Sequence, residues 1–192
     1  NFEFLNFYLS AMGPIIRDHK GFVDKYIGDA IMALFPKSAN DALNAAIAML
    51  KILPEHNLAQ KKRGNFPISI GIGLHTGLLM LGTVGEYNRM ETTVISDAVN
   101  LASRMERLTK MYGASLLISD NTFYRLSNPS QYVVRLIDQV AVKGKTKTTR
   151  VFEVLDGEAS EVKEKKIKTK EEFEKAILLY KSSEFTQLIK IM

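Results

Sequence analysis

The chain of 192 residues contains no cysteine, which excludes a disulfide framework, a zinc finger and catalysis by a thiol. It also has no run of apolar residues long enough to span a membrane. The formal net charge is +5, but the basic residues are scattered and aromatic residues do not interleave with them, so the pattern does not favour nucleic-acid binding. The composition, 46% hydrophobic and 24% charged, indicates a globular domain with one substantial core, and the lack of cysteine is compatible with the cytoplasm.

Helical and strand patterns are mixed along the chain, which indicates an α+β fold. An amphipathic helix is already in progress at Asn1, so we expect the chain to be a fragment. Ser38 and Asp41 resemble a capping pair before a helix that we expect to end at Pro54, and a later helix from about 97 to 111 should end at Gly113. Strands are expected over 66–74, 78–84, 90–95, 115–118, 132–142 and 150–155, with a polar loop at 85–89 and a short helix near 121–126.

The charge-rich segment 156–170 has few apolar residues, which is typical of a solvated linker. After it, apolar residues recur at helical spacing from Phe173 to Tyr180, and Ser182 and Ser183 interrupt the pattern before a second helical run. This pair resembles the opening of a tetratricopeptide-type repeat, although a single unit shows no period. We therefore expect a domain over 1–155, a charged linker over 156–170 and a helical segment over 171–192.

The most informative segment is 21–35, in which two apolar strands meet at a Gly-Asp pair. Such a pair predicts a tight hairpin, with Asp29 projecting from its tip. Alternation along the first strand places Lys25 on one face with Val23 and Ile27, and a charge on this predicted core face needs a partner. The alternative is a structural hairpin whose lysine extends to solvent.

Four blocks of sequence resemble, in the right order, the class III nucleotidyl cyclase catalytic domain, the family of adenylate and guanylate cyclases. The blocks are 21–35, Gly71 to Gly77 (GIGLHTG), Thr92 to Arg104 (TTVISDAVNLASR) and Val142 to Gly144 (VKG), within a resemblance that runs from about Asn1 to Leu155. The resemblance implies a ferredoxin-like antiparallel sheet with helices packed against it. It also implies an adenylate cyclase that forms 3′,5′-cyclic AMP and pyrophosphate from ATP at a site shared by two head-to-tail subunits.

Within this resemblance, Asp29 matches the second of two aspartates that hold two magnesium ions, which manganese can replace. The first aspartate lies on a strand that is missing here, so we expect the chain as printed to be inactive. Asn100 and Arg104, one helical turn apart, match the residues that orient the ribose and stabilise the pentavalent phosphorus. Lys143 matches a lysine that grips the terminal phosphates, and Arg89 a further phosphate contact. Without the family, these would be a turn aspartate and exposed polar residues.

Lys25 matches the position that recognises the purine, where lysine accompanies adenine and glutamate accompanies guanine. Thr93 matches its companion, at which the family often has aspartate and bacterial adenylate cyclases commonly have threonine. Its hydroxyl can accept a hydrogen bond from the adenine amino group, although β propensity alone would also explain a threonine there. The pair favours ATP over GTP.

The competing hypothesis is a non-catalytic nucleotide-binding or dimerisation module in a larger signalling protein, which the absent first aspartate supports. A diguanylate cyclase signature and the nucleophile elbow of a Ser/His/Asp hydrolase are both missing. Gly71, Gly73 and Gly77 lack the spacing of a dinucleotide loop and indicate tight backbone packing, and His75 is expected to be structural. We expect a homodimer with an upstream sensor or regulatory domain, in the cytoplasm, whether or not the parent protein is tethered to a membrane.

Overall fold

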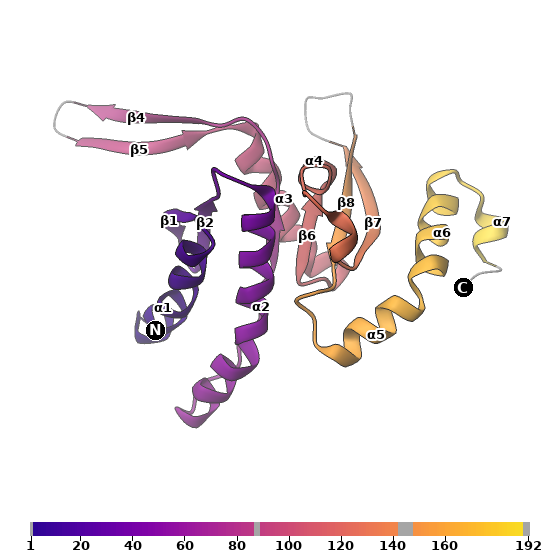
Figure 1. Ribbon diagram of the computed structural model, residues 1–192, viewed down its shortest axis with the longest axis horizontal. Helices are drawn as coiled ribbons and strands as arrows, with labels where there is room; N and C mark the ends of the chain where they lie inside the picture. The colour runs from indigo at the N-terminus through magenta and orange to yellow at the C-terminus, as the bar shows by residue number, and fades with distance from the viewer. Residues whose placement is uncertain (1, 87–88, 142–147, 190–192) are drawn as a thin grey trace.

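The computed structural model describes residues 2–86, 89–141 and 148–189 (Figure 1). The first part of the chain forms α1 (Phe2–Asp18), β1 (Phe22–Ile27), β2 (Ala30–Leu34), α2 (Ala39–Lys62), β3 (Ile72–Leu74), β4 (Met80–Glu86) and β5 (Arg89–Ile95). It continues with α3 (Asp97–Tyr112), β6 (Leu116–Ser119), α4 (Asp120–Phe123), a 3-10 turn (Pro129–Gln131), β7 (Val134–Ala141), β8 (Thr148–Val154), α5 (Ser160–Lys168), α6 (Lys170–Lys181) and α7 (Phe185–Leu188). This mixture confirms the α+β class.

The described strands form one four-stranded sheet and two separate hairpins. The sheet has the order β3-β6-β8-β7, and β1 pairs with β2 and β4 with β5 in antiparallel ladders. The described ladders of this sheet are antiparallel except for the β3–β6 pair, which is parallel. The order α1-β1-β2-α2-β3 is that of a ferredoxin-like βαββαβ unit without its first strand. Figure 1 shows the β4–β5 ribbon extending away from the body, on the side opposite to α5 and α6.

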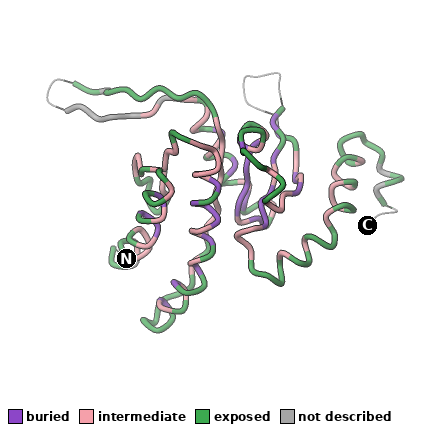
Figure 2. Tube along the Cα trace, viewed as in Figure 1, coloured by how far each residue is buried: buried purple, intermediate pink, exposed green. Residues whose placement is uncertain are grey.

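The four-stranded sheet is covered on both faces, which fixes the position of α3. Leu116 and Ile118 of β6 belong to a buried cluster with α1 and α2, whereas Leu117 between them belongs to a second cluster with Leu101 and Met105 of α3. Because successive side chains of a strand point to opposite faces, the two clusters lie on the two sides of the sheet. Figure 2 shows the buried residues concentrated on α2 and on the central strands.

Helix α2 is longer than the sequence predicted. Ser38 caps it as expected, accepting a hydrogen bond from the Asn40 amide at 3.0 Å, but the helix continues through Pro54 to Lys62. A proline removes one helical hydrogen bond, and packing outweighs this loss because His56 and Gln60 are buried beyond it. The prediction that Pro54 ends the helix was therefore wrong.

The strand predicted over 66–74 forms a ladder only at Ile72–Leu74. Its shared apolar face is confirmed, since Ile68, Ile70 and Ile72 all pack against the same core cluster. Before β3, both hydrogen-bonding groups of the Asn57 side chain bind the backbone of Ile68, in place of a neighbouring strand. The predicted loop at 85–89 is also shorter, because Glu86 and Arg89 already pair in the β4–β5 ladder.

The segment 156–170, for which its charge suggests a solvated linker, is largely exposed, and its role as a linker between domains stays a prediction. It contains α5, and Lys166 of that helix forms an ion pair with the buried Glu153 of β8. The break at Ser182 and Ser183 is confirmed, with Ser183 in a left-handed conformation at φ 62°. A repeat array after α6 stays a prediction. No helix in the described ranges has both the length and the apolar character needed to cross a bilayer.

Candidate functional site

The β1–β2 hairpin turns at Gly28 and Asp29, as predicted. Gly28 has φ 64°, a conformation that glycine adopts without strain, and Asp29 is exposed at the tip. The ladder contains an extra residue between Val23, which pairs with Ala33, and Lys25, which pairs with Met32. Ala33 and Met32 are neighbours on β2 and point to opposite faces, so Val23 and Lys25, which pair with them, also lie on opposite faces. The prediction that Lys25 and Val23 share a face was wrong.

Lys25 has the charge partner that its position requires. Its ammonium lies 3.3 Å from Oδ2 of Asp24, a carboxylate side chain that is only 6% exposed. The Lys25 side chain itself is 38% exposed, so it combines a buried stem with an accessible charged end. An ammonium of this kind can donate hydrogen bonds to a ligand at the surface.

A groove of about 400 Å³ separates the hairpin from the four-stranded sheet. Its walls are the edge of β2, from Ala30 to Leu34, and the segment ending in β3, from Ser69 to Leu74. In the described ladders, β2 pairs only with β1 and β3 only with β6, so these facing edges are unpaired. Asp29 and Ser103 of α3 both line the groove, which brings the hairpin tip and α3 to one hollow.

Helix α3 presents Asn100 and Arg104 to solvent from one side and buries Leu101 and Met105 on another. The Ser96 hydroxyl caps its start by accepting from the Ala98 amide at 2.9 Å, and Gly113 in a left-handed conformation ends it. These features confirm the predicted helix and the separation of its two faces.

The glycines of the GIGLHTG block pack tightly against α3, as predicted. A Cβ atom placed on Gly73 would lie 2.2 Å from the Glu106 amide nitrogen, and one on Gly71 would lie 2.0 Å from Thr109 Oγ1. Glycine at these positions thus lets β3 approach the backbone of the helix that carries Asn100 and Arg104.

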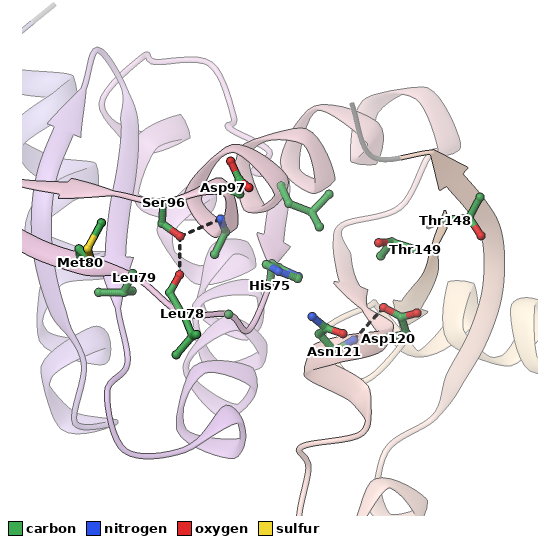
Figure 3. A pocket seen from close by; sticks show the side chains of 13 residues that line it. His75, Leu78, Leu79, Met80, Ser96, Asp97, Asp120, Asn121, Thr148 and Thr149 are labelled. Carbon is green, nitrogen blue, oxygen red and sulfur yellow. Dashed lines mark hydrogen bonds between the residues drawn. The ribbon is translucent and has the colours of Figure 1, made fainter. Parts of the chain in front are cut away.

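A second hollow of about 800 Å³ lies between the start of α3 and the α4–β8 region (Figure 3). Ser96 and Asp97 line one side, and Asp120, Asn121 and Thr149 line the other. Ser96 and Asp97 belong to the TTVISDAVNLASR block, whereas Asp120, Asn121 and Thr149 come from distant segments that no motif of the sequence singles out. They give the hollow a polar, partly acidic wall beside the helix of Arg104.

His75 borders this hollow and has a structural role, as expected. Its Nδ1 shares a hydrogen bond of 2.7 Å with the Ser119 hydroxyl, which is also 3.2 Å from the Thr122 hydroxyl. Ser119 is fully buried, so this Ser-His pair does not offer an accessible nucleophile.

The family model of the adenylate and guanylate cyclase catalytic domain matches residues 2–155. The chain belongs to this family. Three of the similar proteins show how far the likeness extends. An adenylate cyclase of Anabaena cylindrica is 49% identical over 159 residues, which are 80% of this chain and 32% of that protein. The terminal-differentiation specific adenylate cyclase of Dictyostelium discoideum is 40% identical over 185 residues, 93% of this chain and 9% of that protein. The crystal structure of the adenylyl cyclase CyaB from P. aeruginosa superposes with a TM-score of 0.67 at 30% identity, covering 80% of this chain and 81% of that one.

These comparisons set two limits. The chain spans only about a third of the Anabaena protein and a smaller share of the Dictyostelium one. The family includes both adenylate and guanylate cyclases, so membership does not decide the purine.

Since the family match ends at residue 155, the 93% coverage by the Dictyostelium protein includes part of the segment that follows.

The remaining residues matched to the cyclase site lie partly outside the described structure. Thr93 and Arg89 occupy β5, where they pair with Gly82 and Glu86, and their side chains are not described. Lys143 lies outside the described residues altogether. The sequence hypotheses for these three therefore stay predictions.

The cyclase domain offers one carboxylate at the position matched to the metal site. Asp29 is exposed and supplies the hard oxygen donor that magnesium prefers. Within the described ranges, no group of three or more histidine, aspartate or glutamate residues lies close enough to surround an ion. Asp29 is thus suited to magnesium as one ligand, alongside further oxygen donors such as a second carboxylate, nucleotide phosphates or water.

Proposed function

We propose that this cyclase domain is the catalytic part of an adenylate cyclase, which converts ATP to 3′,5′-cyclic AMP and pyrophosphate in signal transduction. The observation that carries the proposal is the 49% identity to an adenylate cyclase over 80% of the chain. The exposed pair on α3 and the paired lysine on β1 support it, because each is available to a nucleotide at the surface.

The choice of ATP rests on Lys25 and Thr93. A lysine ammonium donates hydrogen bonds and accepts none, so it suits the ring nitrogens of adenine, which are acceptors. The ion pair with Asp24 holds that donor beside the hairpin. Thr93 is the proposed companion that accepts from the adenine amino group.

The reaction closes a ring: the 3′-hydroxyl oxygen bonds to the α-phosphorus and releases its proton to solvent, while the bond to the leaving pyrophosphate breaks. Asn100 orients the ribose in this proposal, and Arg104 stabilises the charge on the pentavalent phosphorus through its planar set of donors. Lys143 grips the terminal phosphates, with Arg89 as a further contact. Asn100 and Arg104 lie on one helix, α3, which keeps the ribose and the phosphorus aligned in this proposal.

Asp29 would hold magnesium, or manganese in its place. When bound, two such ions lower the pKa of the 3′-hydroxyl and neutralise charge on the phosphates. We assign the other aspartate ligand to a strand between the unpaired edges of β2 and β3. Support comes from the groove between these edges, which Asp29 lines at the hairpin tip.

We propose that the site forms between two head-to-tail copies, with Asp29 of one copy facing Lys25, Thr93, Asn100, Arg104 and Lys143 of the other. The exposed apolar side chains of Leu78, Met80 and Leu81 around the start of the β4–β5 ribbon support a dimer, as do Tyr26 and Ile27 on β1. Apolar patches of this kind mark protein interfaces.

The short coverage of the relatives supports further domains in the whole protein, including an upstream sensor or regulatory domain. A cytoplasmic location for this domain stays a prediction.

The test uses the full-length protein with magnesium and ATP or GTP, and measures cyclic nucleotide and pyrophosphate together. We expect cyclic AMP and pyrophosphate in equal amounts, loss of both with a chelator, and little cyclic GMP. Arg104→Ala should abolish most turnover, whereas Arg107→Ala on the same helix should not. Nucleotide binding without turnover would instead support a non-catalytic module.

A further inference from the structure

The C-terminal helix α6 covers the open edge of the four-stranded sheet. β7 is the last strand in the sheet order, and Figure 1 shows α6 beside it. The Glu174 carboxylate accepts a hydrogen bond from the Leu136 backbone amide of β7 at 2.8 Å. Leu136 lies where the β7–β8 register shifts, so this helix binds an edge amide at an irregular point of the ladder.

A buried charge network joins the same helices to β8. Glu153 is fully buried, and its two oxygens lie 2.5 Å from Arg135 Nε and 2.5 Å from Lys166 Nζ of α5. The Arg135 guanidinium also stacks on the Phe173 ring of α6, 4.5 Å from its centre. Because a buried carboxylate needs its cations, this network fixes α5 and α6 against the sheet.

Helix α6 also reaches α3 along two routes. Phe173 packs against the cluster that contains Leu101 and Met105 of α3. At the end of α6, the Lys181 ammonium lies 2.6 Å from Asp138 Oδ1 of β7, and the Tyr112 hydroxyl of α3 donates to Asp138 Oδ2 at 2.5 Å. Asp138 is therefore a bridge between α6 and α3.

Tyr112 lies on the buried side of α3, where it packs against the cluster that contains Leu101 and Met105, and Met105 directly follows Arg104. Arg104 precedes it by eight residues, which places the two side chains about 80° apart around the helix axis. Burial and the hydrogen bond to Asp138 raise the pKa of the Tyr112 hydroxyl, and the positive charge of Arg104 opposes this rise. The Arg104 charge therefore acts on the Tyr112 hydroxyl. A tether at Tyr112 thus restricts the rotation and tilt of the helix at Arg104.

We infer that Tyr112 is a positioning residue for Arg104, held through Asp138 by Lys181 of α6. This inference rests on the proposed function in that Arg104 acts on the phosphorus. The C-terminal helices are then part of the catalytic unit, although the family match ends before them. The similarity to the Dictyostelium protein beyond residue 155 agrees with this role.

The test measures kcat and KM for ATP in full-length Tyr112→Phe and Lys181→Met, with Tyr124→Phe and Lys165→Met as controls. Tyr124 lies on the exposed α4 side, and Lys165 pairs only with the exposed Glu161 in the described contacts. We expect about a threefold to tenfold fall in kcat for the two test variants, KM within about twofold, and recovery with Lys181→Arg. The controls should match the wild type.

An Arg104→Ala background separates positioning from stability. If Tyr112 acts through Arg104, Tyr112→Phe lowers the residual kcat no further in that background. If Tyr112→Phe lowers kcat by the same factor in both backgrounds, or if Lys181→Met and Lys165→Met have equal kcat, the inference is overturned. If the wild-type protein makes no cyclic AMP, the proposed function fails and hydrogen exchange decides the inference alone. Faster exchange of α3 amides in Lys181→Met than in Lys165→Met supports it, and equal exchange overturns it.

Discussion

At the scale of single residues, the proposed role of Lys25 in the site depends on the irregularity next to it. The extra residue at Asp24 turns Lys25 to the face opposite Val23 and places a carboxylate beside its ammonium. Strict alternation cannot predict such a bulge from the sequence, because the shift depends on how the partner strand pairs. The need for a charge partner was predictable, since it follows from the cost of burying a charge.

Replacing Lys25 tests its role in base choice. Lys25→Glu should lower ATP turnover by at least about tenfold, because the donor to adenine is lost and a like charge is placed beside Asp24. Lys51→Glu, which makes the same charge change on the exposed side of α2, should leave turnover unchanged. ATP and GTP turnover and the melting temperature would be measured in parallel. Unchanged ATP kinetics and preference in a folded Lys25→Glu protein would remove this residue from the site.

His56 makes stability depend on pH. It is buried against the Phe7 ring at a centroid distance of 4.6 Å, and its Nε2 has no hydrogen-bond partner within the described residues. Burial, and to a lesser extent the nearby Arg63 charge, lower its pKa below the ordinary value. The unfolded chain then binds the proton more readily, so this contribution to stability is present above about pH 6.5 and is lost as pH falls.

We expect the free energy of unfolding to decrease from pH 7.5 to pH 5.5, and His56→Gln to reduce the pH dependence over that range. Urea unfolding at several pH values would measure both. An identical slope for the wild type and His56→Gln would contradict the assignment of this effect to His56.

At the scale of helices and strands, local signals predicted the elements better than their lengths. Ser38, Ser96 and Gly113 act within a turn of a helix end, so the starts of α2 and α3 and the end of α3 were predictable. The passage of α2 through Pro54 depends on contacts made far along the chain, and local propensity contains no information about them. The same limit applies to α5, whose Lys166 pairs with the buried Glu153 of β8.

The contact between β3 and α3 gives a prediction at this scale. Gly73→Ala should destabilise the protein by about 1–3 kcal/mol and shift α3, because the added methyl group meets the Glu106 amide in a tightly packed region. Gly82→Ala in β4 is the matched control, since a Cβ there has no neighbour within 4 Å. Chemical denaturation and turnover would be compared. Equal stability of the two variants would show that β3 can move away at no cost.

At the scale of the whole molecule, we propose a site that is divided between two copies. The sequence brought Asn100 and Arg104 together correctly, because helical spacing fixes their relation. It placed Asp29 at a hairpin tip, but the two hollows needed the fold, since their lining residues come from separate elements. The relation of Asp29 to Arg104 across a dimer stays a proposal.

Mixing two inactive variants tests that division. Asp29→Ala and Arg104→Ala should each lose most activity in the full-length protein, one through metal binding and the other through charge stabilisation. In a mixed dimer, one interface carries both defects and the other carries neither. Random exchange makes about half of the dimers mixed, so the mixture should recover about a quarter of the wild-type activity. Exchange would be verified by labelling, and a mixture that exchanges yet stays inactive would rule out the shared site.

The hydrogen bond from the Leu136 amide to Glu174 also bears on solubility. An uncovered edge strand is a template for pairing with other chains, and α6 is the element that occupies this side of β7. A protein cut after Leu155, where the family match ends, would leave this edge open and remove Lys166 from the buried Glu153. Such a truncated form would retain the proposed catalytic residues but add strands from neighbouring molecules, so its aggregation would be a property of the chosen boundary rather than of the enzyme.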